Sequence, residues 1–337
     1  MSDATAAPPP AVDAAPTPPS TAPRFTLRIE GTAVGDRIYH GAIIFFASCI
    51  PLLLMLLFIE LGRAAWPTFH KFGFSFLTTS RWDPVAGEFG AAPAIYGTIV
   101  TAIIALVVAT PLALGVAIFL SEFAPHWLRQ PLAFLVDLLA AIPSVVYGLW
   151  GIFVLVPVMR TVVMPFLRDT LHLGATPFFS GPAYGPSMLT AGLILAVMVL
   201  PYISSVSREV LLAVPRSQRE AAMALGATRW ETIRSAVIPY AKSGIIGGVI
   251  LGLGRALGET MAVTMLIGNR PEISSSLFAP GYTMASQIAN EFSEASGDLH
   301  LSALMALGFT LFVITLVVNA VARWLVWRVS RGPGVAA

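Results

Sequence analysis

The sequence predicts an all-α integral membrane protein with six transmembrane helices. Only 11% of its 337 residues are Asp, Glu, Lys or Arg, whereas 56% are hydrophobic. A soluble domain has roughly 25% charged residues, so this chain lacks the polar surface needed to cover a core in water. Its charges are also spaced so that uncharged stretches of about 20 residues, long enough to cross the hydrocarbon layer, lie between them.

The six candidate spans follow from the positions of the charges. Five uncharged stretches cover residues 38–59, 95–120, 138–159, 186–207 and 299–322. A sixth stretch, 243–269, is equally apolar apart from Arg255 and Glu259. Prolines lie inside several spans, at Pro51, Pro111, Pro143, Pro157 and Pro201. Neighbouring helices satisfy the backbone groups that a proline leaves without a partner, so we expect kinked spans and not broken ones.

The remaining segments are tails and loops. We expect a disordered Ala/Pro-rich tail over residues 1–35, because its composition cannot bury apolar surface. This tail would be a solvated leader or, alternatively, a recruiting segment. A first transmembrane helix at 36–63 and a loop at 64–93 follow, then a membrane domain at 94–324 and a tail at 325–337.

Basic residues set the orientation. Most of them lie on the side of both termini and of the loops between spans two and three and between spans four and five: Arg24, Arg28, Arg37, Arg129, Arg208, Arg216, Arg219, Arg229, Arg234, Lys242, Arg323, Arg328 and Arg331. The other side carries fewer, together with an acidic last loop. By the positive-inside rule, both termini are cytoplasmic.

The longest cytoplasmic loop between spans, residues 208–242, has the pattern of a docking element. Residues 217–220 and 228–231 each match a capping box, in which Ser or Thr and a Glu three residues later satisfy backbone N–H groups at a helix start. Gly226 lies between them and suits the left-handed turn that ends a helix. We therefore expect two short helices joined by a glycine turn.

The first of these short helices presents alanines, so a partner could approach its backbone closely. Leu225, Trp230 and Ile233 are candidate anchors for that partner. The alternative is an amphipathic pair that lies on the lipid headgroups. Two caps and an alanine face favour a protein partner.

The same loop resembles the EAA loop of ABC importer permeases. Glu220, Ala221, Ala222 and Gly226 match that motif in type and spacing, as does the apolar segment 236–239, although Ala236 and Ile238 replace its usual Ile and Leu. In that family the loop is a coupling helix that inserts into a groove of the cytoplasmic ATPase. The chain contains no G-x-x-x-x-G-K-[ST]. We therefore expect a transport subunit that is not itself an enzyme, with ATP hydrolysed by a partner.

Arg255 and Glu259 need a reason, because an arginine at the centre of a membrane helix costs about 2.5 to 3.5 kcal/mol on insertion scales. Four residues apart, they share a helix face and can form an ion pair. One interpretation is structural: the two charges neutralise each other, or pair with a neighbouring subunit. The other is a substrate path, in which Arg255 exchanges Glu259 for a tetrahedral anion that passes between subunits. The two are compatible, since an ion pair can be the resting state of a gate.

Small residues recur around this pair. Gly244, Gly248 and Gly252 repeat every four residues, and Gly254 and Gly258 have the same spacing. In an apolar span this pattern allows another helix to approach closely. We expect that neighbour to be the equivalent helix of a second permease.

Three segments, residues 142–151, 252–263 and 289–292, together resemble phosphate importer permeases of the PstC type, and the similarity runs from Tyr39 to Val326. The resemblance implies a type I ABC importer permease fold in residues 94–324, located in a bacterial inner membrane. It also implies a heterodimer with a second homologous permease, a cytoplasmic ATPase dimer and a periplasmic phosphate-binding protein.

Other interpretations remain open at this point. Sulfate and molybdate permeases carry a similar Arg-Ala-x-Gly-Glu segment, so another tetrahedral oxyanion is the alternative substrate. An ion-coupled secondary carrier would have an inverted repeat, which the sequence does not display.

No metal site or cofactor is expected, because the five histidines are scattered without ligand spacing. Asp137 is expected to pair with a loop arginine, and the turn-rich loop 174–186 either faces the binding protein or is a spacer.

Overall fold

The computed structural model describes residues 33–330 and confirms the all-α class. Six of its helical segments are long and apolar enough to cross a membrane: Gly35–Phe72, Ala92–Phe123, Ser144–Thr170, Met188–Leu212, Arg229–Leu257 and Asp298–Arg328. In this part of the chain, β pairing is limited to one isolated bridge between Asp83 and Glu88. The expected disordered tail falls almost entirely outside the described residues.

The chain divides into two units, residues 1–54 and 55–337. Helix α1 (Ala33–Phe72) crosses the boundary between them. After the polar residues Asp36, Arg37 and His40, residues 41–54 are uncharged and almost all exposed, which suits a lipid or protein environment. The helix also continues through residues 64–72, which we expected in a loop, because the chain turns only at Gly73, where φ is 58°.

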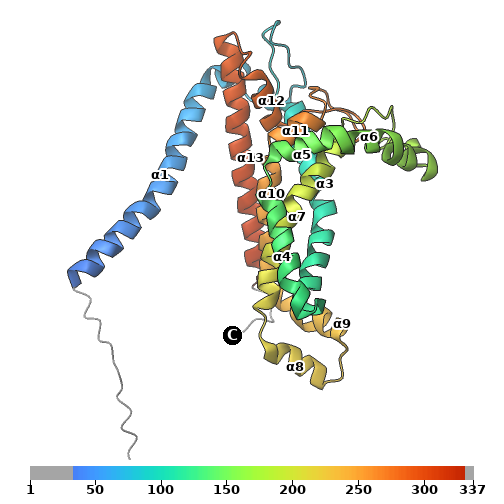
Figure 1. Cartoon of the computed structure of the whole chain (residues 1–337). Helices are drawn as coiled ribbons and strands as arrows, with labels where there is room; N and C mark the ends of the chain where they lie inside the picture. Colours follow the sequence, from blue (N-terminus) through green and yellow to red (C-terminus); the bar gives the residue numbers. More distant parts are fainter. Residues whose placement is uncertain (1–32, 331–337) are drawn as a thin grey trace, which may run out of the picture. The chain divides into compact units, whose positions relative to one another are not determined.

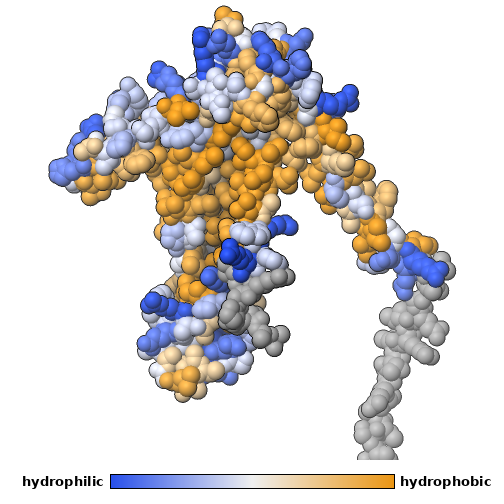
Figure 2. All heavy atoms as spheres, turned by 180° about the vertical axis from the view of Figure 1, so that it is seen from behind, coloured by the Kyte–Doolittle hydropathy of each residue, from blue (hydrophilic) through white to orange (hydrophobic). Residues whose placement is uncertain are grey.

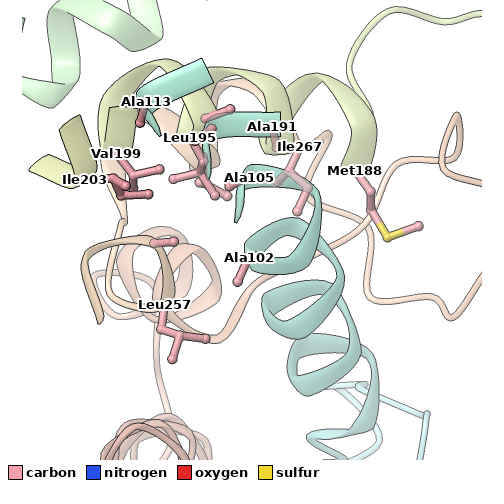
Figure 3. Close-up of a cluster of buried hydrophobic side chains, with 14 residues drawn as sticks. Ala102, Ala105, Ala113, Met188, Ala191, Leu195, Val199, Ile203, Leu257 and Ile267 are labelled. Carbon is pink, nitrogen blue, oxygen red and sulfur yellow. The ribbon is translucent and has the colours of Figure 1, made fainter. Parts of the chain in front are cut away.

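Three helices form the centre of the second unit: α3 (Ala92–Ile118), α7 (Met188–Leu212) and α10 (Ile238–Leu257). Figure 3 shows alanines of α3 facing the branched side chains of α7. The two helices approach so closely at Gly192 that a methyl group there would lie 2.5 Å from Ile104. Small residues on both helices therefore bring these spans together, as is typical of membrane bundles.

The third predicted span is broken. Helix α4 (His126–Ala141) ends before Ile142, whose backbone is extended, and α5 (Ser144–Trp150) begins after Pro143. Proline disfavours helical geometry in the residue before it and donates no backbone hydrogen bond. The kink that we expected at Pro143 is thus a break, whereas Pro111 and Pro201 lie inside continuous helices.

The two halves of the broken span lie differently. Helix α4 lies beside α7, where Asp137 Oδ2 is 3.9 Å from Arg208 Nη2. After α5 the chain continues through Gly151–Leu155, Val156–Val158, Met159–Val163 and Phe166–Thr170, in which π-helical segments alternate with the short helix α6. Figure 1 shows this part of the chain crossing one end of the second unit.

The predicted span at residues 243–269, the fifth in chain order, is also interrupted. Helix α10 ends at Leu257, and α11 (Met261–Leu266) begins after a short break. Helices α12 (Met284–Glu291) and α13 (Asp298–Ser330) complete the described residues, and α13 continues through residues 325–330, where we expected a tail.

The two ends of the second unit differ. Figure 1 shows α8 (Arg216–Ala224) and α9 (Arg229–Thr232) at one end and α5, α11 and α12 at the other. On the face drawn in Figure 2, hydrophobic side chains form a band between ends that carry hydrophilic ones. A membrane-embedded protein has this distribution.

Candidate functional site

The predicted docking loop folds as two helices joined by a tight turn. Gly226 has φ 86°, and the N–H groups of Gly226 and Ala227 donate to the carbonyls of Met223 and Ala222 at 2.9 and 3.2 Å. These bonds satisfy carbonyl groups at the end of α8 that have no partner within the helix. Glycine supplies the left-handed conformation that this turn requires.

Only one of the two capping boxes forms. Glu231 N–H donates to Thr228 Oγ1 at 3.3 Å, and Thr228 N–H donates to Glu231 Oε2 at 2.8 Å, so α9 begins as predicted. The box at Ser217 is absent, because α8 begins two residues earlier than this box requires, at Arg216, with Pro215 as its N-cap. Pro215 takes the N-cap position with φ −57° and ψ 142°, and Ser217 therefore lies inside the first turn.

The outward face of the loop carries most of the residues that the motif indicated. Glu220, Ala221 and Gly226 are exposed and Ala222 is half-buried. The side chain of Leu225 is 91% exposed and that of Trp230 55%. Ile233, in contrast, is buried in the core of this chain, so its prediction as an anchor for a partner was wrong.

Arg255 and Glu259 do lie together, but not on one continuous helix. Arg255 Nη2 is 3.4 Å from Glu259 Oε2, and Glu259 lies beyond the end of α10, in the break before α11. Arg255 is in the last turn of α10, where the helix dipole favours a cation. Its guanidinium also lies 5.7 Å from the centre of the Tyr202 ring, a cation–π distance.

The two members of this pair differ in exposure. The Glu259 side chain is 4% exposed and the Arg255 side chain 40%. The carboxylate is therefore covered, while part of the guanidinium remains accessible. A planar guanidinium with accessible N–H groups can bind an oxyanion.

The glycines of α10 divide between two faces. A methyl group at Gly244 or Gly252 would lie 2.5 or 2.7 Å from Val210 or Ile203, both on α7, and Gly248 also faces α7. The expected neighbour for this row, a second permease, is thus wrong, because a helix of the same chain already packs there. A methyl group at Gly254 would meet nothing within 4 Å, and one at Gly258 only a backbone oxygen of the same helix at 3.7 Å.

A polar cluster that no sequence pattern predicted lies at the end opposite α8. The Glu291 carboxylate accepts hydrogen bonds from Trp82 Nε1 at 2.7 Å and Gln287 Nε2 at 3.2 Å, and its Oε2 lies 3.1 Å from His300 Nε2. These contacts join the loop after the short helix α2 (Ser75–Thr78) to α12 and α13. Nearby, burial raises the pKa of Tyr282 to about 12. The only signal in the sequence was a carboxylate inside the 289–292 segment.

These features can be compared with known proteins. Residues 109–331 match the family described as binding-protein-dependent transport system inner membrane component. The chain belongs to this family.

Phosphate transport system permease proteins of several bacteria are similar to this chain over most of its length. The chain is 48% identical over 304 residues to the phosphate transport system permease protein PstC of Mesorhizobium japonicum, covering 90% of this chain and 93% of that protein. It is 52% identical over 266 residues to PstC of Xylella fastidiosa strain Temecula1, covering 78% and 81%. The similarity therefore extends well beyond the docking loop.

Solved structures with the same fold include two ABC transporters. One is the MetNI methionine ABC transporter in an inward-facing conformation, with a TM-score of 0.53 and 17% identity over 71% of this chain and 95% of that one. The other is a bacterial ABC transporter that imports alginate, with a TM-score of 0.54 and 16% identity over 88% and 100%. At these identities the likeness concerns the fold, and it confirms the ABC importer permease fold.

Proposed function

We propose that this chain is the membrane-spanning permease subunit of an ATP-driven importer of inorganic phosphate. The observation that carries the proposal is its 48% identity, over 90% of the chain, to a phosphate transport system permease. The sequence has no nucleotide-binding loop of the G-x-x-x-x-G-K-[ST] type. ATP is therefore hydrolysed by a separate ATPase dimer, and a periplasmic binding protein delivers phosphate.

The α8–α9 loop is the docking site for the ATPase. Its exposed Leu225 and Trp230 are large apolar side chains that this chain leaves uncovered, and such side chains at a surface mark a protein interface. The alanines at 221 and 222 allow the backbone of α8 to approach a groove. Because basic residues are concentrated at this end, it faces the cytoplasm, together with both termini.

Arg255 and Glu259 form the anion path. In the resting state Glu259 neutralises Arg255. A phosphate that reaches the accessible side of the guanidinium can replace the carboxylate by accepting two parallel hydrogen bonds. When the anion leaves, Glu259 returns, so the site does not hold phosphate tightly.

A second homologous permease packs on the open face of α10. Gly247 and Gly254 have no neighbour within 4 Å of an added methyl group, and Leu251 on the same face is 61% exposed. Glycines on such a face allow a second helix to approach closely. Because Arg255 lies beside this face, the path would run between the two permeases.

Reconstitution tests this function directly. The assembled complex of both permeases, the ATPase dimer and the binding protein is placed in proteoliposomes. Uptake of radiolabelled phosphate, sulfate and molybdate is measured with ATP inside or outside. We expect uptake of phosphate that requires ATP and the binding protein. Sulfate- or molybdate-specific uptake would favour the other oxyanions, and uptake without the ATPase that collapses with the proton gradient would favour a secondary carrier.

A further inference from the structure

Arg219 is the main polar attachment of helix α8 to the rest of the chain. Seven of the nine residues of α8 are exposed, and only Arg219 and Ala222 are partly buried. These two residues are three positions apart and therefore lie on one side of the helix. The opposite side carries the surface that we assign to the ATPase.

The Arg219 guanidinium binds the end of α7. Its Nη2 donates to the carbonyl of Leu211 at 2.8 Å, and its Nη1 donates to the carbonyl of Val214 at 2.5 Å. Leu211 is in the last turn of α7, where carbonyl groups have no partner within the helix. A cation at this position also interacts favourably with the helix dipole.

The same guanidinium binds the end of α3. Arg219 Nη2 lies 2.8 Å from Glu122 Oε1, and the two side chains are 19% and 15% exposed. Glu122 lies in the π-helical segment Phe119–Phe123, which follows α3 directly. A charge-assisted hydrogen bond shielded from water in this way is stronger than a surface ion pair.

We propose that Arg219 is a positioning residue that transmits the movement of α8 to the membrane helices α7 and α3. This proposal rests on the proposed function, in which the ATPase displaces α8. One planar side chain with donors on two nitrogens holds three separate elements, so a displacement of α8 moves the ends of α7 and α3 with it. A lysine has a single nitrogen on a flexible stem and does not reproduce this geometry.

An apolar attachment supplements this link without replacing it. Ile233 and Val237, which follow α9, are buried against Ala117, Ile118 and Leu211. This contact anchors the C-terminal part of the loop. Helix α8 also packs against this segment, and its polar attachment to α7 and α3 is the set of bonds made by Arg219.

The test uses the full reconstituted complex and measures phosphate moved per ATP hydrolysed. The variants are Arg219→Gln, Arg219→Lys, Glu122→Gln and the double variant Arg219→Gln/Glu122→Gln, with Arg216→Gln as the control on an exposed residue of the same helix. We expect Arg219→Gln and Glu122→Gln to assemble and hydrolyse ATP. Their transport per ATP should be lowered by about tenfold, as for a typical coupling between two sites. Transport per ATP in the double variant should fall no further than in Arg219→Gln alone, because each of these variants breaks the same link between Arg219 and Glu122.

Several results would overturn the proposal. Normal transport per ATP in Arg219→Gln, an equal fall in Arg216→Gln, or additive losses in the double variant would each do so. Should Arg219→Gln fail to assemble, Arg219→Lys and Glu122→Gln decide: a lowered ratio in both supports the link, and a normal ratio in both refutes it.

A further variant separates this inference from the proposed function. Leu225→Arg places a charge on the outward face of the docking loop and leaves Arg219 intact. If Leu225→Arg still binds the ATPase normally, the docking site itself is wrong. If Leu225→Arg loses the ATPase but Arg219→Gln transports normally, only the role of Arg219 fails.

Discussion

Arg255 Nη2 lies 3.4 Å from Glu259 Oε2, although the helix that carries Arg255 ends two residues before the carboxylate. The ion pair therefore bridges the break between α10 and α11 instead of lying along one helix. A pair at such a break can open by a change in a few backbone angles. This geometry suits a gate better than a pair inside a continuous helix.

Replacing Arg255 should stop transport without dissolving the complex. We expect Arg255→Gln to lower phosphate uptake by at least about tenfold, because a neutral amide loses the charge-assisted hydrogen bonds to the anion. Uptake in proteoliposomes and copurification of the subunits are measured on the same preparation, with Lys242→Gln as a control. Loss of assembly with Arg255→Gln would instead support a purely structural pair.

The two rows of glycines in α10 should respond differently to a methyl group. Gly252→Ala places a carbon 2.7 Å from Ile203, and overpacking of this kind costs about 1–3 kcal/mol. We expect it to lower the thermal unfolding temperature of the isolated subunit in detergent. Gly254→Ala meets nothing within 4 Å in this chain, so the isolated subunit should be unaffected while its association with the second permease weakens. Equal effects of both substitutions on the isolated subunit would contradict this assignment of faces.

Glu291 should stabilise the end of the second unit opposite α8. Glu291→Ala removes the carboxylate that accepts hydrogen bonds from Trp82 Nε1 and Gln287 Nε2, so these partly buried donors lose their acceptor. Such a loss costs about 1–3 kcal/mol for each unsatisfied group. We expect a lower unfolding temperature in detergent than with Glu294→Ala, which alters an exposed carboxylate in the segment that follows. A similar unfolding temperature for the two variants would argue against a stabilising role of the cluster.

The two expected capping boxes provide a matched comparison. Thr228→Ala removes the side chain that accepts from Glu231 N–H, which costs about 1 kcal/mol of helix stability. Ser217→Ala should change little, because Ser217 caps no helix. Hydrogen exchange of the 228–237 backbone amides measures the difference, and faster exchange is expected only with Thr228→Ala. Faster exchange within α8 on Ser217→Ala would show that this serine does stabilise a helix start.

Local sequence determined much of this architecture. The number of spans follows from where charges are missing, and the turn in the docking loop follows from Gly226, because only glycine adopts its backbone angle readily. The capping box at Thr228 was predicted because its partners lie three residues apart, although the same spacing at Ser217 gives no box, since α8 begins earlier, after Pro215. In each case the interacting groups are close along the chain, so their spacing carries the information.

The tertiary structure decided what depends on distant partners. Proline content did not distinguish the break at Pro143 from the continuous helix at Pro201, since neighbouring helices determine whether the lost hydrogen bond is tolerated. The spacing of glycines did not reveal that Gly252 faces α7 while Gly254 is open. The link between Arg219 and Glu122 joins residues 97 positions apart. No local pattern predicts such a pair, because it exists only once the ends of α3, α7 and α8 have been brought together.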